Sequence, residues 1–113
     1  STGSVIPTWL AAMHRGEEVE MRDPNVTRFY MRLPEAIALV FGTAAAMRGG
    51  ELVIPDLPAY RLGDLAEAMG VRCRPPNGLG PGEKRAERMD ASRCSETARR
   101  MTIDELKKEL TCL

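Results

Sequence analysis

The stretch DPNVTRFYMRLPEAIALVF, residues 23–41, decides the fold of this chain. Asp23-Pro24-Asn25 is typical of a turn, and residues 26–33 are rich in the β-branched and aromatic side chains that favour a strand. Pro34 follows, and proline is favoured at the first position of a helix. The stretch therefore predicts a turn, a strand and a helix in succession.

Arg28 lies in the middle of this predicted strand, among apolar and aromatic neighbours. A guanidinium there is costly to remove from water unless an anion or a charged partner meets it. Two interpretations stay open. Arg28 either makes a bidentate contact with a bound phosphate, or forms a salt bridge with Glu20 or Asp23 across a hairpin.

Four segments combine helical apolar spacing with a capping residue at the start or a glycine after the end. They are residues 4–15, 34–47, 62–69 and 102–110. We expect Ser4 to cap the first segment, which would leave free backbone amides at that helix start. In the last segment, Thr102 and Glu105 have the spacing of a capping box.

Short apolar or alternating runs predict strands at residues 17–22, 51–54 and 71–74. We expect residues 17–22 to form a hairpin with the Arg28 strand, and residues 56–60 to be a loop held open by Pro58 and the preceding Pro55. Residues 75–82 hold three prolines and three glycines, a strong turn signal. The pattern predicts a small mixed α/β fold in one unit, residues 1–113, with part of residues 82–100 flexible and a C-terminal helix within 101–113.

Composition narrows the classes of partner. Sixteen basic residues balance sixteen acidic ones, so no global field attracts nucleic acid or an anionic membrane. No run approaches the roughly 18–20 apolar residues that span a bilayer, and residues 1–4 do not resemble a secretory signal. We expect a cytoplasmic protein without a membrane span.

Motifs for catalysis are not found in this sequence. It contains no Gly-x-Gly-x-x-Gly phosphate loop, no Tyr-x-x-x-Lys pair and no Gly-x-Ser-x-Gly elbow. Three cysteines about 20 residues apart fit neither a disulfide framework nor a zinc site. We therefore expect no catalytic residue, cofactor site or metal site in this chain.

A series of landmarks resembles a known family. The landmarks are GSVIP at 3–7, TRFYM at 27–31, LPEA at 33–36, GGELVIP at 49–55, LGDLA at 62–66, PGEK at 81–84 with Glu87, and RMTIDEL at 100–106. In this order they resemble the polysaccharide-biosynthesis branch of the extended short-chain dehydrogenases, the UDP-N-acetylglucosamine 4,6-dehydratases and inverting dehydratase-epimerases. The resemblance covers nearly all of the chain.

The resemblance implies a substrate-binding α/β subdomain without the Rossmann half that carries NAD or NADP and the Tyr-x-x-x-Lys pair. The implied ligand is a UDP-sugar, and the implied partner is a cofactor-binding half in the same or a separate chain. The residues that it implies for binding are Arg28 at the diphosphate, Val5 and Pro7 beside the nucleotide, Val19 and Met21 beside the uracil, Glu83 and Lys84 at the ribose and phosphate, and Tyr30. Such a piece alone would expose an apolar face and self-associate.

One departure from the family pattern concerns the diphosphate. The family has an arginine directly before Pro-Gly-Glu-Lys, where this chain has Gly80. Losing one charged hydrogen-bond partner costs about 1.5–3 kcal/mol, and Arg74, Arg85 or Arg88 are the candidates to replace it. The alternative is a stand-alone interaction or regulatory module that keeps the fold and has lost the ligand.

Overall fold

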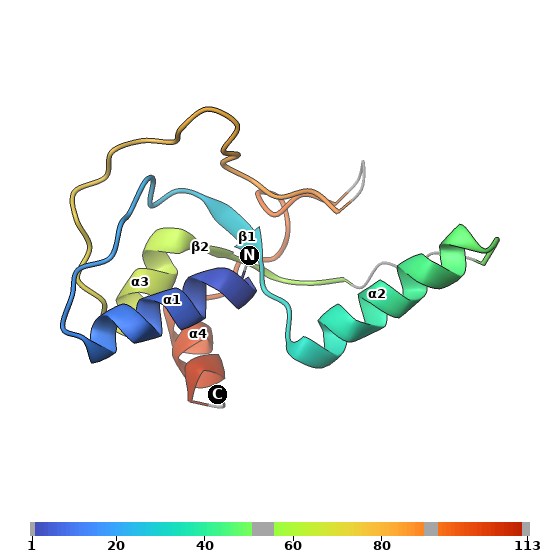
Figure 1. Ribbon diagram of the computed structural model, residues 1–113, viewed down its shortest axis with the longest axis horizontal. Coiled ribbons are helices and arrows are strands. Elements are labelled where there is room, and N and C mark those ends of the chain that lie inside the picture. Colours follow the sequence, from blue (N-terminus) through green and yellow to red (C-terminus); the bar gives the residue numbers. More distant parts are fainter. Residues whose placement is uncertain (1, 51–55, 90–92, 112–113) are drawn as a thin grey trace.

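The computed structural model describes residues 2–50, 56–89 and 93–111. Over these ranges the chain has a small mixed α/β fold, which confirms the predicted fold class at this level. The elements are α1 (Thr2–His14), β1 (Thr27–Phe29), α2 (Leu33–Met47), β2 (Ala59–Arg61), α3 (Leu62–Met69) and α4 (Ile103–Leu110). Figure 1 shows α1, α3 and α4 gathered around the two strands, while α2 extends away from them.

The sheet pairs β1 with β2 in antiparallel orientation, with Arg28 opposite Tyr60. The prediction that residues 56–60 are only a loop was therefore wrong, because Ala59 and Tyr60 lie in β2 and are 0% exposed. Pro58 directly precedes β2, at a strand entrance where proline is tolerated. In the sequence, this proline favours a loop. The strand forms because β2 pairs with β1, which lies about 30 positions earlier in the chain.

The predicted hairpin was also wrong, although its turn forms. The Asn25 N–H donates to Asp23 Oδ1 at 2.9 Å, as in an Asx turn. Residues 17–22 do not become a strand, and instead the Val19 N–H donates to the Arg72 carbonyl at 2.8 Å in an isolated parallel bridge with Cys73. The predicted strand at 71–74 is reduced to the same bridge, and the predicted strand at 51–54 lies outside the described residues.

The helices that were predicted from local signals form close to the expected bounds. In α1, however, the buried residues are Ile6, Trp9 and Ala12, while Leu10 is 45% exposed. The helix begins at Thr2, so residue 4 lies inside it and not at the N-cap position expected for it. The main core combines residues of α1, α3 and α4 with side chains from the strands and loops: Ile6, Trp9, Ala12, Val19, Met21, Tyr30, Tyr60, Leu65, Ala66, Met69, Met101 and Leu106.

The capping box of α4 is confirmed. The Glu105 N–H donates to Thr102 Oγ1 at 3.1 Å, and the Thr102 N–H donates to Glu105 Oε1 at 3.2 Å. These bonds satisfy donors that a helix start would otherwise leave open. The hydrogen bond from the Thr102 backbone, helped by Arg99, holds the pKa of Glu105 below its usual value. Leu106, which is 0% exposed, then anchors α4 in the core.

Within the described ranges, none of the helices combines the length and the apolar character that crossing a bilayer requires.

Thr102→Ala should lower the free energy of unfolding by about 1 kcal/mol, because the N-terminal amides of α4 lose their side-chain acceptor. Urea unfolding followed by circular dichroism measures this loss. Thr43→Ala is the matched control, since Thr43 is exposed in α2 and its hydroxyl only bonds back to the Leu39 carbonyl. Equal losses in the two variants would contradict a role for the capping box.

Glu105→Gln should flatten the acid dependence of stability. A carboxylate whose folded pKa is lowered stabilises the fold above its unfolded pKa of about 4.3, and this stabilisation is lost as the pH falls through the folded pKa. Glutamine accepts the same hydrogen bonds without titrating. Between pH 7 and pH 3, the wild type should therefore lose more unfolding free energy than the variant, as measured by urea titrations. A parallel loss in both proteins would refute the link.

Candidate binding site

Arg28 is held by backbone carbonyls. Its Nη1 donates to the Thr27 carbonyl at 2.7 Å and to the Arg85 carbonyl at 3.1 Å, and its Nη2 donates to the Lys84 carbonyl at 2.6 Å. Asp23 pairs with Arg85 instead, at 3.2 Å. Among the described residues, the salt bridge of Arg28 with Glu20 or Asp23 is not formed, so that interpretation was wrong.

The guanidinium of Arg28 keeps donors to spare. It has five N–H groups, and the three bonds to carbonyls account for three of them. Within the described part of the chain, the Nε–H and one Nη2–H are left without a protein acceptor. The side chain is partly exposed, so an anion could reach these donors. Arg28 can thus hold the loop at residues 80–85 and still contact an anionic ligand.

The same loop is fastened to the outer edge of β1, the edge away from β2. The Thr27 N–H donates to the Arg85 carbonyl at 2.8 Å, and the Phe29 N–H donates to Glu87 Oε1 at 3.0 Å. Carbonyl and carboxylate oxygens therefore take the place of a third strand. This arrangement fixes where Lys84 and Arg85 lie relative to Arg28.

Ser95 secures this edge from inside. Its side chain is 0% exposed, and its hydroxyl donates to the Thr27 carbonyl at 3.0 Å and accepts the Glu87 N–H at 2.7 Å. The Thr27 hydroxyl, also buried, lies 2.9 Å from Ser95 Oγ. Because buried polar groups are costly to leave unsatisfied, this small network determines how the segment at residues 85–89 packs on β1.

Arg22 lies beside Gly80, where the resemblance expects an arginine. A Cβ added at Gly80 would lie 2.7 Å from the Glu83 carboxylate and 3.4 Å from Arg22 Nη1. Arg22 also forms an ion pair with Glu83, with Nε 3.4 Å from Oε1. The guanidinium of Arg22 therefore lies near the position from which an arginine at residue 80 would extend.

Sequence reasoning missed Arg22, because the contact that places it is non-local. The Gly78 N–H donates to the Arg22 carbonyl at 2.8 Å, which joins two segments separated by more than 50 residues. No spacing in the sequence marks this pairing. Among the arginines proposed as replacements, Arg85 is paired with Asp23.

The predicted site residues fall into separate groups. Arg28, Glu83 and Lys84 belong to the one assembly just described. Val5 and Val19 line a hollow of about 430 Å³ along α1, while Pro7 is exposed on the same helix. Val19 is only 4% exposed, and its assignment to the uracil ring stays a prediction.

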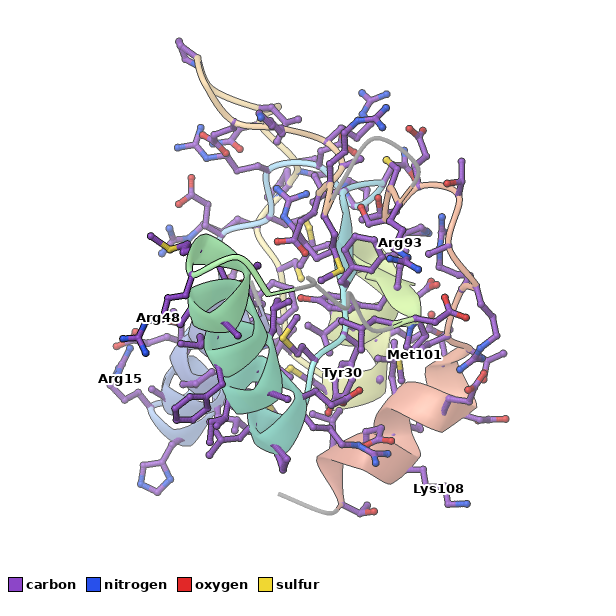
Figure 2. The ribbon with its side chains drawn as sticks, turned by 90° about the vertical axis from the view of Figure 1, so that its right-hand side faces the viewer. Arg15, Tyr30, Arg48, Arg93, Met101 and Lys108 are labelled. Atoms are coloured by element: carbon purple, nitrogen blue, oxygen red, sulfur yellow. The ribbon has the colours of Figure 1, made fainter. Side chains whose placement is uncertain are left out.

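The two remaining predicted residues lie in the main core. Met21 is 4% exposed and Tyr30 is 6% exposed. Tyr30 also borders a hollow of about 480 Å³, which Met101 and Lys108 line as well (Figure 2). Three glutamates and three cationic side chains line this hollow, and its charges are paired within the protein: Arg32 with Glu109, and Arg99 with Glu105.

Comparison with known proteins gives a consistent assignment. The profile of a family described as "Polysaccharide biosynthesis protein" matches residues 1–106. The UDP-N-acetylglucosamine 4,6-dehydratase (inverting) of Campylobacter jejuni is 33% identical over 99 residues, covering 81% of this chain and 28% of that protein. The capsular polysaccharide biosynthesis protein CapD of Staphylococcus aureus is 33% identical over 101 residues, covering 79% of this chain and 16% of that protein.

A solved structure shares the fold. The X-ray structure of Pen from Bacillus thuringiensis superposes with a TM-score of 0.75 at 22% identity, covering 98% of this chain and 45% of that one. At this identity the likeness concerns the fold alone. The chain spans between 16% and 28% of the length of the two curated relatives.

Ser95→Ala should lower the free energy of unfolding by about 1–3 kcal/mol, since it leaves buried partners on Thr27 and Glu87 unsatisfied. It should also speed hydrogen exchange at the Thr27 and Glu87 amides, which amide exchange by NMR would detect. Thr97→Ala removes an exposed hydroxyl from the same segment and is the control. Unchanged exchange in Ser95→Ala would show that this network does not hold the loop.

Proposed function

The chain belongs to the polysaccharide biosynthesis protein family, and from this premise we propose that it is the UDP-sugar-binding part of a 4,6-dehydratase-like enzyme. Its relative in Campylobacter jejuni is named as a dehydratase of UDP-N-acetylglucosamine. The observation that carries the proposal is the placement of Arg28, which is tied to the loop at residues 80–85 while two of its N–H groups remain available.

A diphosphate suits this arrangement chemically. Charge-assisted hydrogen bonds from guanidinium to phosphate oxygens are among the stronger polar contacts in proteins. Because β1 and the loop already fix Arg28, little side-chain freedom is lost when the ligand binds. Lys84 extends from the adjacent, exposed loop and would add a second positive charge, with Glu83 at the ribose end.

Arg22 extends the proposal to the position of the missing arginine. Its guanidinium lies beside Gly80, where it pairs with Glu20 at 3.3 Å and with Glu83 at 3.4 Å, and in this proposal the diphosphate takes the place of these carboxylates. In this proposal Arg22, and not Arg74, Arg85 or Arg88, compensates for Gly80. Glu20 and Glu83 then neutralise Arg22 when no ligand is bound.

The glycine-rich segment at residues 78–82 does not suit a nicotinamide cofactor. Dinucleotide sites cradle the pyrophosphate on a glycine-rich turn that opens directly into a helix. The glycines at positions 78, 80 and 82 lead into residues 83–89, which are not helical. We assign NAD or NADP to a cofactor-binding half, in the same or a separate chain, and give this chain the task of orienting the sugar nucleotide.

A second candidate function is that of an interaction module that has lost the ligand. Two observations favour it: Gly80 replaces a charged residue, and α2 has an exposed apolar face. The two functions differ in whether the chain binds UDP at all.

Isothermal titration of the chain with UDP and with UDP-N-acetylglucosamine tests the proposed function. Lys84→Ala should weaken binding about 10-fold to 100-fold through loss of one charged contact. This variant is informative because the Lys84 carbonyl that receives Arg28 is retained. Arg28→Ala should abolish measurable binding. Arg48→Ala, which changes an exposed arginine following α2 (Figure 2), should bind as the wild type does.

If the wild type binds neither ligand while its circular dichroism spectrum is that of a folded α/β protein, the sugar-nucleotide function is refuted and the interaction module is favoured. If it binds both and Lys84→Ala is unaffected, the site lies elsewhere on the chain.

A further inference from the structure

Arg22 is shared between two carboxylates. Its Nε lies 3.3 Å from Glu20 Oε1 and 3.4 Å from Glu83 Oε1. The neighbours Val19 and Met21 are each 4% exposed, so the chain alternates here between core-facing residues and the outward-facing Glu20 and Arg22. Because one guanidinium faces two carboxylates, this group of side chains carries an excess of negative charge.

The two carboxylates differ in how firmly the protein holds them. Glu83 Oε1 also accepts the Gly80 N–H at 3.1 Å, so this carboxylate takes part in shaping the loop at residues 80–85. Glu20 is contacted in addition by Asn77 Nδ2 at 3.4 Å, a distance longer than an ordinary N–H···O bond. The ion pair with Arg22 is therefore the main interaction of Glu20, whereas Glu83 has a second one with the backbone.

Arg28 differs from Arg22 because the groups that hold it are uncharged. The bonds that it donates within the described residues go to backbone carbonyls. Glu20, which the sequence suggested as its partner, pairs with Arg22 instead. A phosphate that enters the site therefore meets a full positive charge at Arg28, but a compensated charge at Arg22.

We propose that Glu20 competes with the second phosphate of the ligand for Arg22, and so limits the affinity of the site for a diphosphate. This inference rests on the proposed function, in which Arg28 and Arg22 both contact the diphosphate. A phosphate pairs with Arg22 only when Glu20 withdraws, because carboxylates and a phosphate around one guanidinium repel one another. The side chain of Glu20 is 52% exposed, so it can turn into water when the ligand binds.

The number of phosphates on the ligand decides whether this competition occurs. The single phosphate of UMP binds at Arg28, where the charge is not compensated, and leaves Arg22 paired with Glu20. The second phosphate of UDP extends to Arg22 and has to replace Glu20 there. Glu20 thus reduces the gain in affinity that the second phosphate brings, and leaves the binding of the first unchanged.

Isothermal titration of the complete chain with UDP and with UMP tests the proposal. Glu20→Gln keeps the size of the side chain and removes its charge, and it should bind UDP about 2-fold to 5-fold more tightly, the factor that an exposed ion pair contributes. Its affinity for UMP should equal that of the wild type. Glu67→Gln is the matched control, because it removes the same charge from an exposed position on α3 and should bind both nucleotides as the wild type does.

A second background separates competition for Arg22 from a general effect of charge. In Arg22→Gln the competitor has nothing to compete for, so adding Glu20→Gln should bring no further gain in UDP affinity. The proposal is overturned if wild type and Glu20→Gln bind UDP equally well, if UMP gains as much as UDP, or if the gain persists in Arg22→Gln. These results leave the proposed function intact, since UDP still binds.

Two other outcomes concern a wild type that does not bind UDP. If Glu20→Gln does not bind it either, the proposed function is refuted and this inference with it. If Glu20→Gln alone binds UDP, the inference is supported, because removing the competitor has then made the site accessible.

Discussion

The fold depends on how the two edges of one short strand are satisfied. Thr27–Phe29 is buried at alternate residues, and buried backbone groups need hydrogen-bond partners. One edge of β1 pairs with β2. The other edge bonds to the Arg85 carbonyl, the Glu87 carboxylate and the Ser95 hydroxyl. With both edges occupied, no place is left for the hairpin partner that the turn at Asp23 suggests.

The same requirement assembles the candidate site. The segment that closes the outer edge of β1 contains Lys84 and Arg85, so closing the edge brings their carbonyls to the guanidinium of Arg28. Under the proposed function, the contacts that stabilise the fold also position the groups that would hold a diphosphate. Such preorganisation reduces the entropy that is lost on binding. It also means that changes at Arg28 affect both folding and binding, whereas the ammonium of Lys84 is free of this double role.

The apolar residues fall into two groups, a buried core and an exposed face of α2. Residues of α1, α3 and α4 surround Tyr60, Leu65 and Leu106 in one core, whereas α2 leaves its large side chains in solvent. A chain of 113 residues can bury only a limited core. The apolar side chains of α2 therefore make up a large share of the apolar surface that this part of the chain leaves in water.

The sequence by itself determined the elements that arise from local chemistry. The turn at Asp23, the three helices after it and the capping box of Thr102 all follow from residues within a few positions of one another, and the order of landmarks was enough to indicate the family. Only the tertiary structure decided that residues 59–61 form a strand and that Arg22 lies beside Gly80. Each of these depends on contacts between segments dozens of residues apart, and such contacts leave no periodicity or spacing in the sequence.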